Sequence, residues 1–165
     1  MTSPGRRRPS PLLKAFFDGP RWLYNHRMGW LMGRRFLALS HVGRRSGIER
    51  QSILEVAVHD PDTQESIVGS AFGTQADWYR NIRATPAHRV QVGNTVYAPH
   101  QRFLEPEEVR AAAEEFCRAH RLEARMAIPV FVAMGAVEKG EFSDPVDLMA
   151  SLPMVAFRPA DPPPE

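Results

Sequence analysis

The sequence predicts an α+β fold in a single domain, and three observations lead to this prediction. Runs rich in apolar and β-branched residues, bounded by Gly, Pro, Asp and Asn, are typical of strands. A segment that begins at Pro106 and runs to about His120 has acidic residues early and basic residues late, the order that a helix dipole favours. The length of 165 residues suits one domain with a sizeable core. The expected strands are 36–42, 50–59, 67–72, 88–92, 95–104 and 154–157.

Two further helical patterns complete the expected elements. Residues 77–83 are predicted to form a short helix, in which Asn81 ties down a loop while Tyr79 lies on the opposite, outward face. Helical character resumes after Leu122, and Pro129 is expected to break it, because proline lacks the N–H that continues a helix. The apolar piece 126–134 could line a pocket, but it is expected to pack in the core.

The ends of the chain differ in composition from the rest. Residues 1–11 are rich in Pro, Ser, Gly and Arg, which predicts a disordered basic lead-in. Residues 12–158 are expected to form the one domain, and 159–165 a proline-rich tail.

The bulk composition excludes several classes of protein. Lys and Arg total 21 against 19 Asp and Glu, a formal net charge of only +2, and no nucleic-acid-binding module is recognisable. The single cysteine, Cys117, rules out an internal disulfide framework and suits a reducing cytoplasm. The six histidines form no pair at the i, i+4 spacing of a helical zinc site, so no metal is predicted. No stretch approaches the roughly 20 apolar residues that span a bilayer.

The stretch VGRRSGIERQSIL, residues 42–54, carries the strongest chemical signal. It places two glycines, three arginines and a serine between two strand-like runs. Glycine accepts positive φ, so Gly43 and Gly47 would let backbone N–H groups converge on an anion, and Arg50 would add a donor from the flank. The other donors at this turn are Arg44, Arg45 and Ser46. The competing interpretation is a surface hairpin with solvated charges, since Gly, Ser and Arg are common in loops.

Beyond this turn, the chain resembles a known family over about its central two thirds. The matching segments are LALSHVGRRSGIERQSILEV (37–56), GSAFG (69–73), DWYRNIRATP (77–86), VQVG (90–93) and LPMVAFRP (152–159). In this order and spacing they resemble the deazaflavin-dependent nitroreductase family, whose members use coenzyme F420.

The resemblance implies a small antiparallel split β-barrel of the FMN-binding type, with helices on the outside. The pattern of residues 12–33 is helical, and it is expected to form an N-terminal helical lid, because a small barrel needs one. It also implies that the GRRSG turn holds the polar tail and phosphate of the deazaflavin, while the second and third segments wall its ring. Ser70 is expected to orient the ring or substrate by a hydrogen bond. The cofactor-binding residues carried over are Arg44, Arg45, Ser46, Gly47, Arg50, Ser52, Ile53, Gly69, Ser70, Ala71, Phe72, Gly73, Asp77, Trp78 and Asn81.

Two departures from the family pattern concern the substrate. Ala71 stands where several members carry a basic residue, and no tyrosine follows Tyr97 to match those that line the substrate side in nitroimidazole-reducing members. The specific substrate therefore does not carry over.

The function that the resemblance implies is hydride transfer from reduced coenzyme F420 to an electron-poor acceptor, namely a quinone, a nitroaromatic or an enone. Because the cofactor supplies the hydride, no protein nucleophile is needed. Two alternatives are a non-catalytic carrier of a lipid or another flat ligand on the same barrel, and an enzyme that uses FMN. A homodimer is expected by analogy alone.

The basic, aromatic stretch 12–35 has two interpretations. Its apolar face caps the barrel as a lid, or it rests on an anionic membrane surface. The single cysteine and the lack of a long apolar stretch lead us to expect the chain in the cytoplasm. Under the second interpretation of 12–35 it also contacts the inner face of the plasma membrane.

Overall fold

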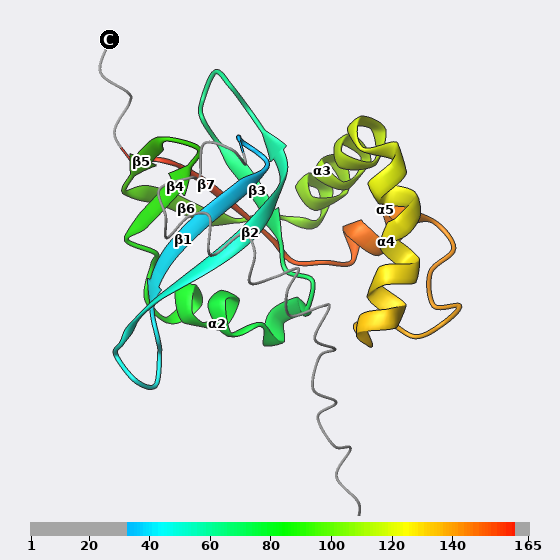
Figure 1. Ribbon diagram of the computed structural model, residues 1–165, viewed down its shortest axis with the longest axis horizontal. Coiled ribbons are helices and arrows are strands. Elements are labelled where there is room, and N and C mark those ends of the chain that lie inside the picture. The colour runs from blue at the N-terminus through cyan, green and yellow to red at the C-terminus, as the bar shows by residue number, and fades with distance from the viewer. Residues whose placement is uncertain (1–32, 161–165) are drawn as a thin grey trace, which may run out of the picture.

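The computed structural model describes residues 33–160. Seven strands and five helical segments follow one another along this part of the chain (Figure 1). The elements are β1 (Phe36–Val42), β2 (Glu49–His59), β3 (Ser66–Gly69), η2 (Gly73–Gln75), α2 (Asp77–Ala84), β4 (Arg89–Val92), β5 (Thr95–Tyr97), β6 (Pro99–Phe103), α3 (Pro106–Ala119), α4 (Arg121–Met134), α5 (Pro145–Ala150) and β7 (Met154–Pro159).

The strands form one antiparallel sheet in the order β5-β4-β1-β2-β3-β7-β6. Its two outermost strands, β5 and β6, are consecutive in the chain and are separated only by Ala98. The sheet therefore curls until its edges meet, and Ala160 N–H donates to Ala98 O at this corner over 2.9 Å. The result is the nearly closed antiparallel barrel with outer helices that the sequence predicted.

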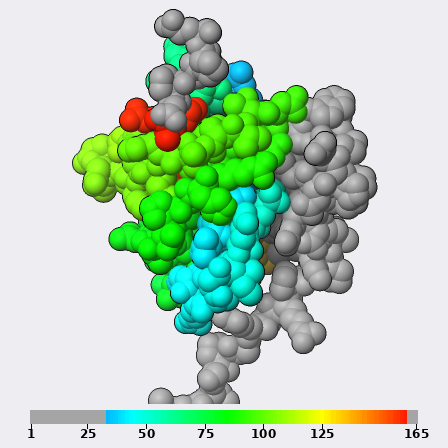
Figure 2. Space-filling view, turned by 90° about the vertical axis from the view of Figure 1, so that its left-hand side faces the viewer, coloured from blue at the N-terminus to red at the C-terminus, as the bar shows by residue number. Residues whose placement is uncertain are grey.

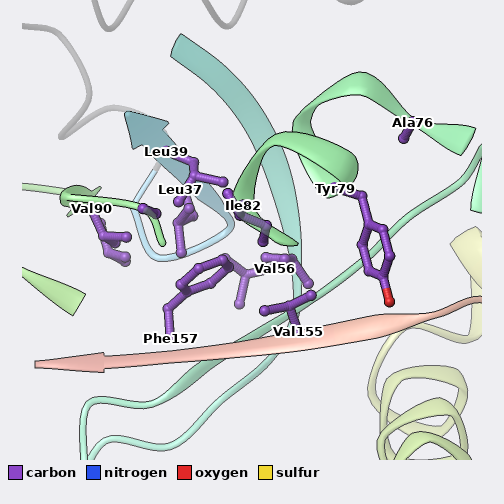
Figure 3. Packing of buried hydrophobic residues seen from close by; sticks show 12 residues of the cluster. Leu37, Leu39, Val56, Ala76, Tyr79, Ile82, Val90, Val155 and Phe157 are labelled. Carbon is purple, nitrogen blue, oxygen red and sulfur yellow. The ribbon is translucent and has the colours of Figure 1, made fainter. Parts of the chain in front are cut away.

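The barrel interior is an apolar core built from alternate strand residues. Leu37 and Leu39 of β1 pair in register with Val92 and Val90 of β4, and all four are buried. In Figure 3 the Phe157 side chain points from β7 into the same cluster, and it is fully buried. Because side chains alternate between the two faces of a strand, this periodicity selects the residues that fill the barrel.

A second core lies between the outer surface of the barrel and the helices. Ala57 and Met154 face outward from β2 and β7 and pack against Ala113 and Phe116 of α3 and Met149 of α5. Figure 1 shows α3, α4 and α5 grouped on one side of the barrel and α2 at one end of it. Strands β2 and β7 are thus covered on both faces, whereas the β1–β2 hairpin projects away from α3, α4 and α5.

Several predicted boundaries are confirmed and others are wrong. Strand β1 spans the predicted residues, and β2 begins one residue early, at Glu49. The predicted strand 67–72 ends at Gly69, because the chain then turns: Gly73 N–H donates to Ser70 O over 2.9 Å, and the Ser70 hydroxyl donates to Gly73 O. The predicted strand 95–104 is two strands, since the chain changes partners at Ala98.

The helix that Pro129 was expected to break continues through it. Helix α4 runs from Arg121 to Met134 and ends at Gly135, which has φ +69°. Proline costs one hydrogen bond there, but Phe131 packs against the second core and holds the following turn. The expectation that the whole apolar piece packs in the core is also wrong, since Met126 and Val130 are exposed.

Two more differences concern short elements near the C-terminus. Helix α5 was not predicted, because six residues are too few for a periodic pattern; Asp144 caps it by accepting from Val146 N–H over 2.7 Å. Pro159, assigned to the tail, is the last residue of β7 and lies opposite Pro99.

The predicted basic lead-in, the helical lid and most of the tail lie outside the described residues. Within residues 33–160, no helix has both the length and the apolar character needed to cross a membrane.

Phe157 is predicted to stabilise the barrel far more than the exposed Phe72. Replacing Phe157 by alanine leaves a cavity among fully buried neighbours and should lower the free energy of unfolding by about 3–5 kcal/mol. Phe72→Ala is the matched control: the ring is 54% exposed, and its loss should cost less than about 1 kcal/mol. Urea unfolding measures both. Similar losses in the two variants would contradict the assignment of the core.

Candidate cofactor site

The turn of the β1–β2 hairpin depends on both of its glycines, for different reasons. Gly47 has φ +65°, a conformation that other residues rarely adopt. Gly43 has ordinary φ, but a Cβ there would lie 2.6 Å from Ser46 Oγ and 3.0 Å from Arg50 Nε. The turn is therefore closely packed around Gly43.

The backbone N–H groups of this turn do not converge on an open point, so that part of the sequence interpretation is wrong. Gly43 N–H donates to Ile48 O, and the N–H groups of Ser46 and Gly47 both donate to Gly43 O, over 2.8–3.2 Å. The N–H of Ile48 donates to Ser46 Oγ over 3.3 Å. Because the hairpin uses these donors itself, an anion at this turn has to be bound by side chains.

Helix α2 holds the hairpin through Arg44. The Arg44 backbone N–H and Nη1 both donate to Asn81 Oδ1, over 3.1 and 3.0 Å, and Nη1 also contacts Asp77 Oδ1 at 3.0 Å. The hydrogen bond from Arg44 lowers the pKa of Asp77. Asn81 is buried, and its predicted role in tying down a loop is confirmed. Tyr79, by contrast, is buried against Phe103 and not on an outward face.

The same Asn81 amide reaches a buried histidine on β1. Asn81 Nδ2 lies 3.3 Å from His41 Nδ1, and His41 Nε2 lies 3.1 Å from Ser52 Oγ on β2. His41 is only 2% exposed. Burial lowers its pKa, and the nearby positive charge of Arg50 and the His88 ring lower it further. His41 is consequently a neutral ring at pH 7, held between two hydrogen-bonding partners.

These elements enclose one side of an open groove with a volume of about 690 Å³. Figure 2 shows the cyan hairpin beside the green surface to which α2 and β4 belong. The lining is mainly polar and charged, and Ile48 and Trp78 supply its larger apolar surface. The lining residues are Ser40, His41, Ile48, Glu49, Arg50, Gln51, Ser52, Asp77, Trp78, Asn81 and Arg89.

The charges at this groove are unbalanced. Among residues 33–160, the carboxylates nearby are engaged: Asp77 pairs with Arg44, and Glu49 pairs with His88 Nε2 at 3.1 Å. Arg45, Arg50 and Arg89 are exposed and form no ion pair within that range. Three guanidinium groups on and beside the groove are therefore free to bind an anion, which fits the side-chain part of the sequence prediction.

The structure brings together only part of the predicted site. Arg50, Ser52, Asp77, Trp78 and Asn81 line the groove, and Arg44 is fixed at its base. Several predicted residues do not line it, at the hairpin tip, along β2 and in the second segment: Arg45, Ser46, Gly47, Ile53, Gly69, Ser70, Ala71, Phe72 and Gly73.

Ser70 is not placed as an orienting group for a ligand. It is fully buried, and its hydroxyl donates to Gly73 O over 2.7 Å, which stabilises the turn before η2. The structure gives no support to its predicted hydrogen bond to a ring or substrate. Gly73, with φ +60°, belongs to the same turn.

The sequence interpretation missed His41 and Arg89. His41 lies inside the first recognised segment but was given no role there, and Arg89 lies between two of the segments. The strand pairing could have suggested them, because Arg89 lies opposite Ser40 and His41 opposite Arg50 once the register of β1 is known.

Asn81 is predicted to be the main support of the hairpin. Asn81→Leu keeps the approximate volume but leaves the Arg44 backbone N–H and the buried His41 Nδ1 without partners, which should lower the free energy of unfolding by about 2–4 kcal/mol. Asp77→Asn removes an exposed ion pair and should cost at most about 1 kcal/mol. Chemical denaturation compares the two variants. An equal cost would mean that the ion pair, and not the buried amide, holds the hairpin.

Comparison with known proteins identifies the family to which the chain is similar. The sequence profile described as F420H(2)-dependent quinone reductase matches residues 21–133, more than half of the chain, and it includes β1, the hairpin, α2, β4 and α3. No curated protein sequence matches the chain.

The solved structures to which the chain is similar have low sequence identity to it. One described only as a domain-swapped dimer is 17% identical, covers 90% of this chain and 100% of its own, and has a TM-score of 0.51. An F420-H2 dependent reductase, FDR-A, is 18% identical over 76% of this chain and 96% of its own, with a TM-score of 0.49. A pyridoxamine 5′-phosphate oxidase-related, FMN-binding protein from Nostoc punctiforme is 15% identical over 92% of this chain and 81% of its own, with a TM-score of 0.49.

The extent of the profile match, together with the split barrel, decides the classification: this chain belongs to the F420H(2)-dependent quinone reductase family and is an oxidoreductase whose cofactor is reduced coenzyme F420.

Proposed function

We propose that reduced coenzyme F420 binds in the groove between the β1–β2 hairpin and α2, and that the chain passes its hydride to a quinone. The observation that carries the proposal is the set of three arginines that form no ion pair with other residues of 33–160: Arg50 and Arg89, which line an open groove, and Arg45 at the hairpin tip. The acceptor class follows the name of the family.

The donor set suits the acidic end of the cofactor. Guanidinium groups bind phosphate and carboxylate oxygens in pairs, and here two exposed arginines line the groove with a third at the hairpin tip. Arg44 contributes differently, because its backbone N–H and its Nη1 are already bonded to Asp77 and Asn81. Its task is to hold the hairpin at a constant distance from α2, so that the other arginines are presented in one geometry.

The apolar part of the groove suits a flat ring. Trp78 is half-buried, packs edge-on against Tyr79 with ring centroids 5.7 Å apart, and lines the groove together with the exposed Ile48. A ring placed against Trp78 would be shielded from water on one side, while the Ser52 hydroxyl and the Gln51 amide offer hydrogen bonds at its edge.

The reaction needs no acid, base or nucleophile from the protein beyond this placement. When bound, reduced F420 supplies the hydride, and the residues of the groove orient it and leave its other face to the acceptor. A quinone takes the hydride directly at an electron-poor centre, and the hydroquinone anion that forms takes one proton from water. Nitroaromatics and enones are weaker candidates here.

The alternative functions receive less support from the groove. A lipid carrier needs an apolar cavity, whereas most residues that line this groove are polar or charged. FMN, with a single phosphate, would use fewer of the three arginines. The role of residues 69–73 at the ring, the homodimer and the membrane contact of residues 12–35 stay predictions.

The proposal predicts that Arg50 and Arg89 each contribute to cofactor affinity. Arg50→Gln and Arg89→Gln should each weaken binding of F420 about tenfold or more, the equivalent of one charge-assisted hydrogen bond. Arg118→Gln is the matched control: it removes the same charge from the exposed surface of α3, away from the groove. Fluorescence titration of F420 at low and high salt measures the affinities, and wild-type binding should weaken as salt rises.

If Arg118→Gln weakens binding as much as the two groove variants, the effect is one of net charge and the groove is not the site. If the groove variants lose affinity but F420H2 is not oxidised when a naphthoquinone is added, the cofactor site stands and the quinone is the wrong acceptor.

A further inference from the structure

His41 occupies a central position that the proposed function has not yet used. It lies at the base of the groove, almost fully buried, between the Asn81 amide on α2 and the Ser52 hydroxyl on β2. One ring therefore connects two elements that line opposite parts of the same groove.

The hydrogen bonds determine which ring nitrogen carries the proton. Asn81 Oδ1 accepts twice from Arg44, so the amide must present its NH₂ group to His41. His41 Nδ1 is then an acceptor, which leaves the ring proton on Nε2 for donation to Ser52 Oγ. Because the serine oxygen accepts this bond, its own proton is free to point into the groove.

We infer that His41 is the positioning residue of this groove: as a neutral ring with its proton on Nε2, it fixes the Asn81 amide that holds Arg44 and turns the Ser52 hydroxyl proton toward the bound cofactor. The inference rests on the proposed cofactor site. It extends that proposal by naming the residue that holds Asn81 and Ser52 in fixed positions relative to each other.

Protonation of the ring would oppose this arrangement. A proton on Nδ1 would face the NH₂ group of Asn81, and the amide could meet it only by turning over. Its NH₂ group would then face the two donors of Arg44, whose hydrogen bonds would be lost. The exposed Arg44–Asp77 ion pair would then be the remaining described contact of Arg44 with α2, so the hairpin would be held less firmly and cofactor affinity would fall.

The charges around His41 favour the neutral ring. Arg50 lies opposite it on β2, and Arg44 of the turn shares its Asn81 partner. From the start of β4, His88 and Arg89 approach the same region, with His88 paired to Glu49. The carboxylate on α2, Asp77, is already bound to Arg44. Burial and then Arg50 and His88 lower the pKa of His41, so the ring takes up a proton only below its ordinary titration range.

A first test needs no cofactor. Nitrogen NMR of the histidine side chains in the full-length protein should show His41 at pH 7 with an unprotonated Nδ1 and a proton on Nε2. Asn81→Asp should raise the pKa of His41, because a carboxylate accepts from a protonated Nδ1. A proton on Nδ1, or a charged ring at pH 7, would overturn the inference even if F420 binds as proposed.

A second test measures the affinity for F420 in wild type, His41→Gln and His88→Gln from pH 7.5 down to one unit below the His41 pKa that the NMR titration measures. Glutamine can still donate to Ser52 but does not titrate. Wild type and the His88 control should lose affinity relative to His41→Gln, about tenfold for each pH unit below the pKa of His41. Comparison with His41→Gln cancels any titration of the cofactor itself.

The inference fails if the ratio of wild-type to His41→Gln affinity is independent of pH. It also fails if His88→Gln, and not His41→Gln, removes the pH dependence of the affinity. Failure of the cofactor site would look different, because Arg50→Gln and Arg118→Gln would then behave alike while the NMR test would still report the state of the ring.

Discussion

The buried amide of Asn81 is the contact on which the functional end of this molecule depends. Its oxygen accepts from the backbone and side chain of Arg44, and its nitrogen faces His41. A β-hairpin whose turn projects from a barrel has few packing contacts of its own. The buried Asn81 amide ties the hairpin to α2 and makes it one wall of a groove. If the hairpin moved away, this amide would be left without partners, and the free-energy cost would exceed the conformational entropy that the hairpin gained.

This constraint also explains why the anion site consists of side chains. The turn is compact around Gly43, and its N–H groups are used to keep it so. The backbone N–H groups therefore form hydrogen bonds within the turn, whereas Arg50 and Arg89 remain exposed on the surface of the groove. A long acidic cofactor is better served by several extended guanidinium groups than by one small concavity, since its charges are spread along its length.

The split barrel supplies the frame for this arrangement. Strands β5 and β6 belong to opposite edges of the sheet although only Ala98 separates them, so the chain itself closes the barrel. The interior is packed with apolar residues and the second core attaches α3 and α5, which leaves the hairpin end open to ligands. The packed parts of the sheet thus stabilise the fold, while the hairpin end of the same sheet provides the binding surface.

The sequence by itself determined the fold class, the family and the span of β1, because a mostly apolar run and the GRRSG and DWYRN segments are local patterns. It also identified Asn81 as a tether. Only the tertiary structure decided which donors face the groove: the turn consumed its own N–H groups, Ser70 entered a buried turn, and the strand register brought in His41 and Arg89. Such outcomes depend on competition among partners distant in the chain, which local patterns do not record.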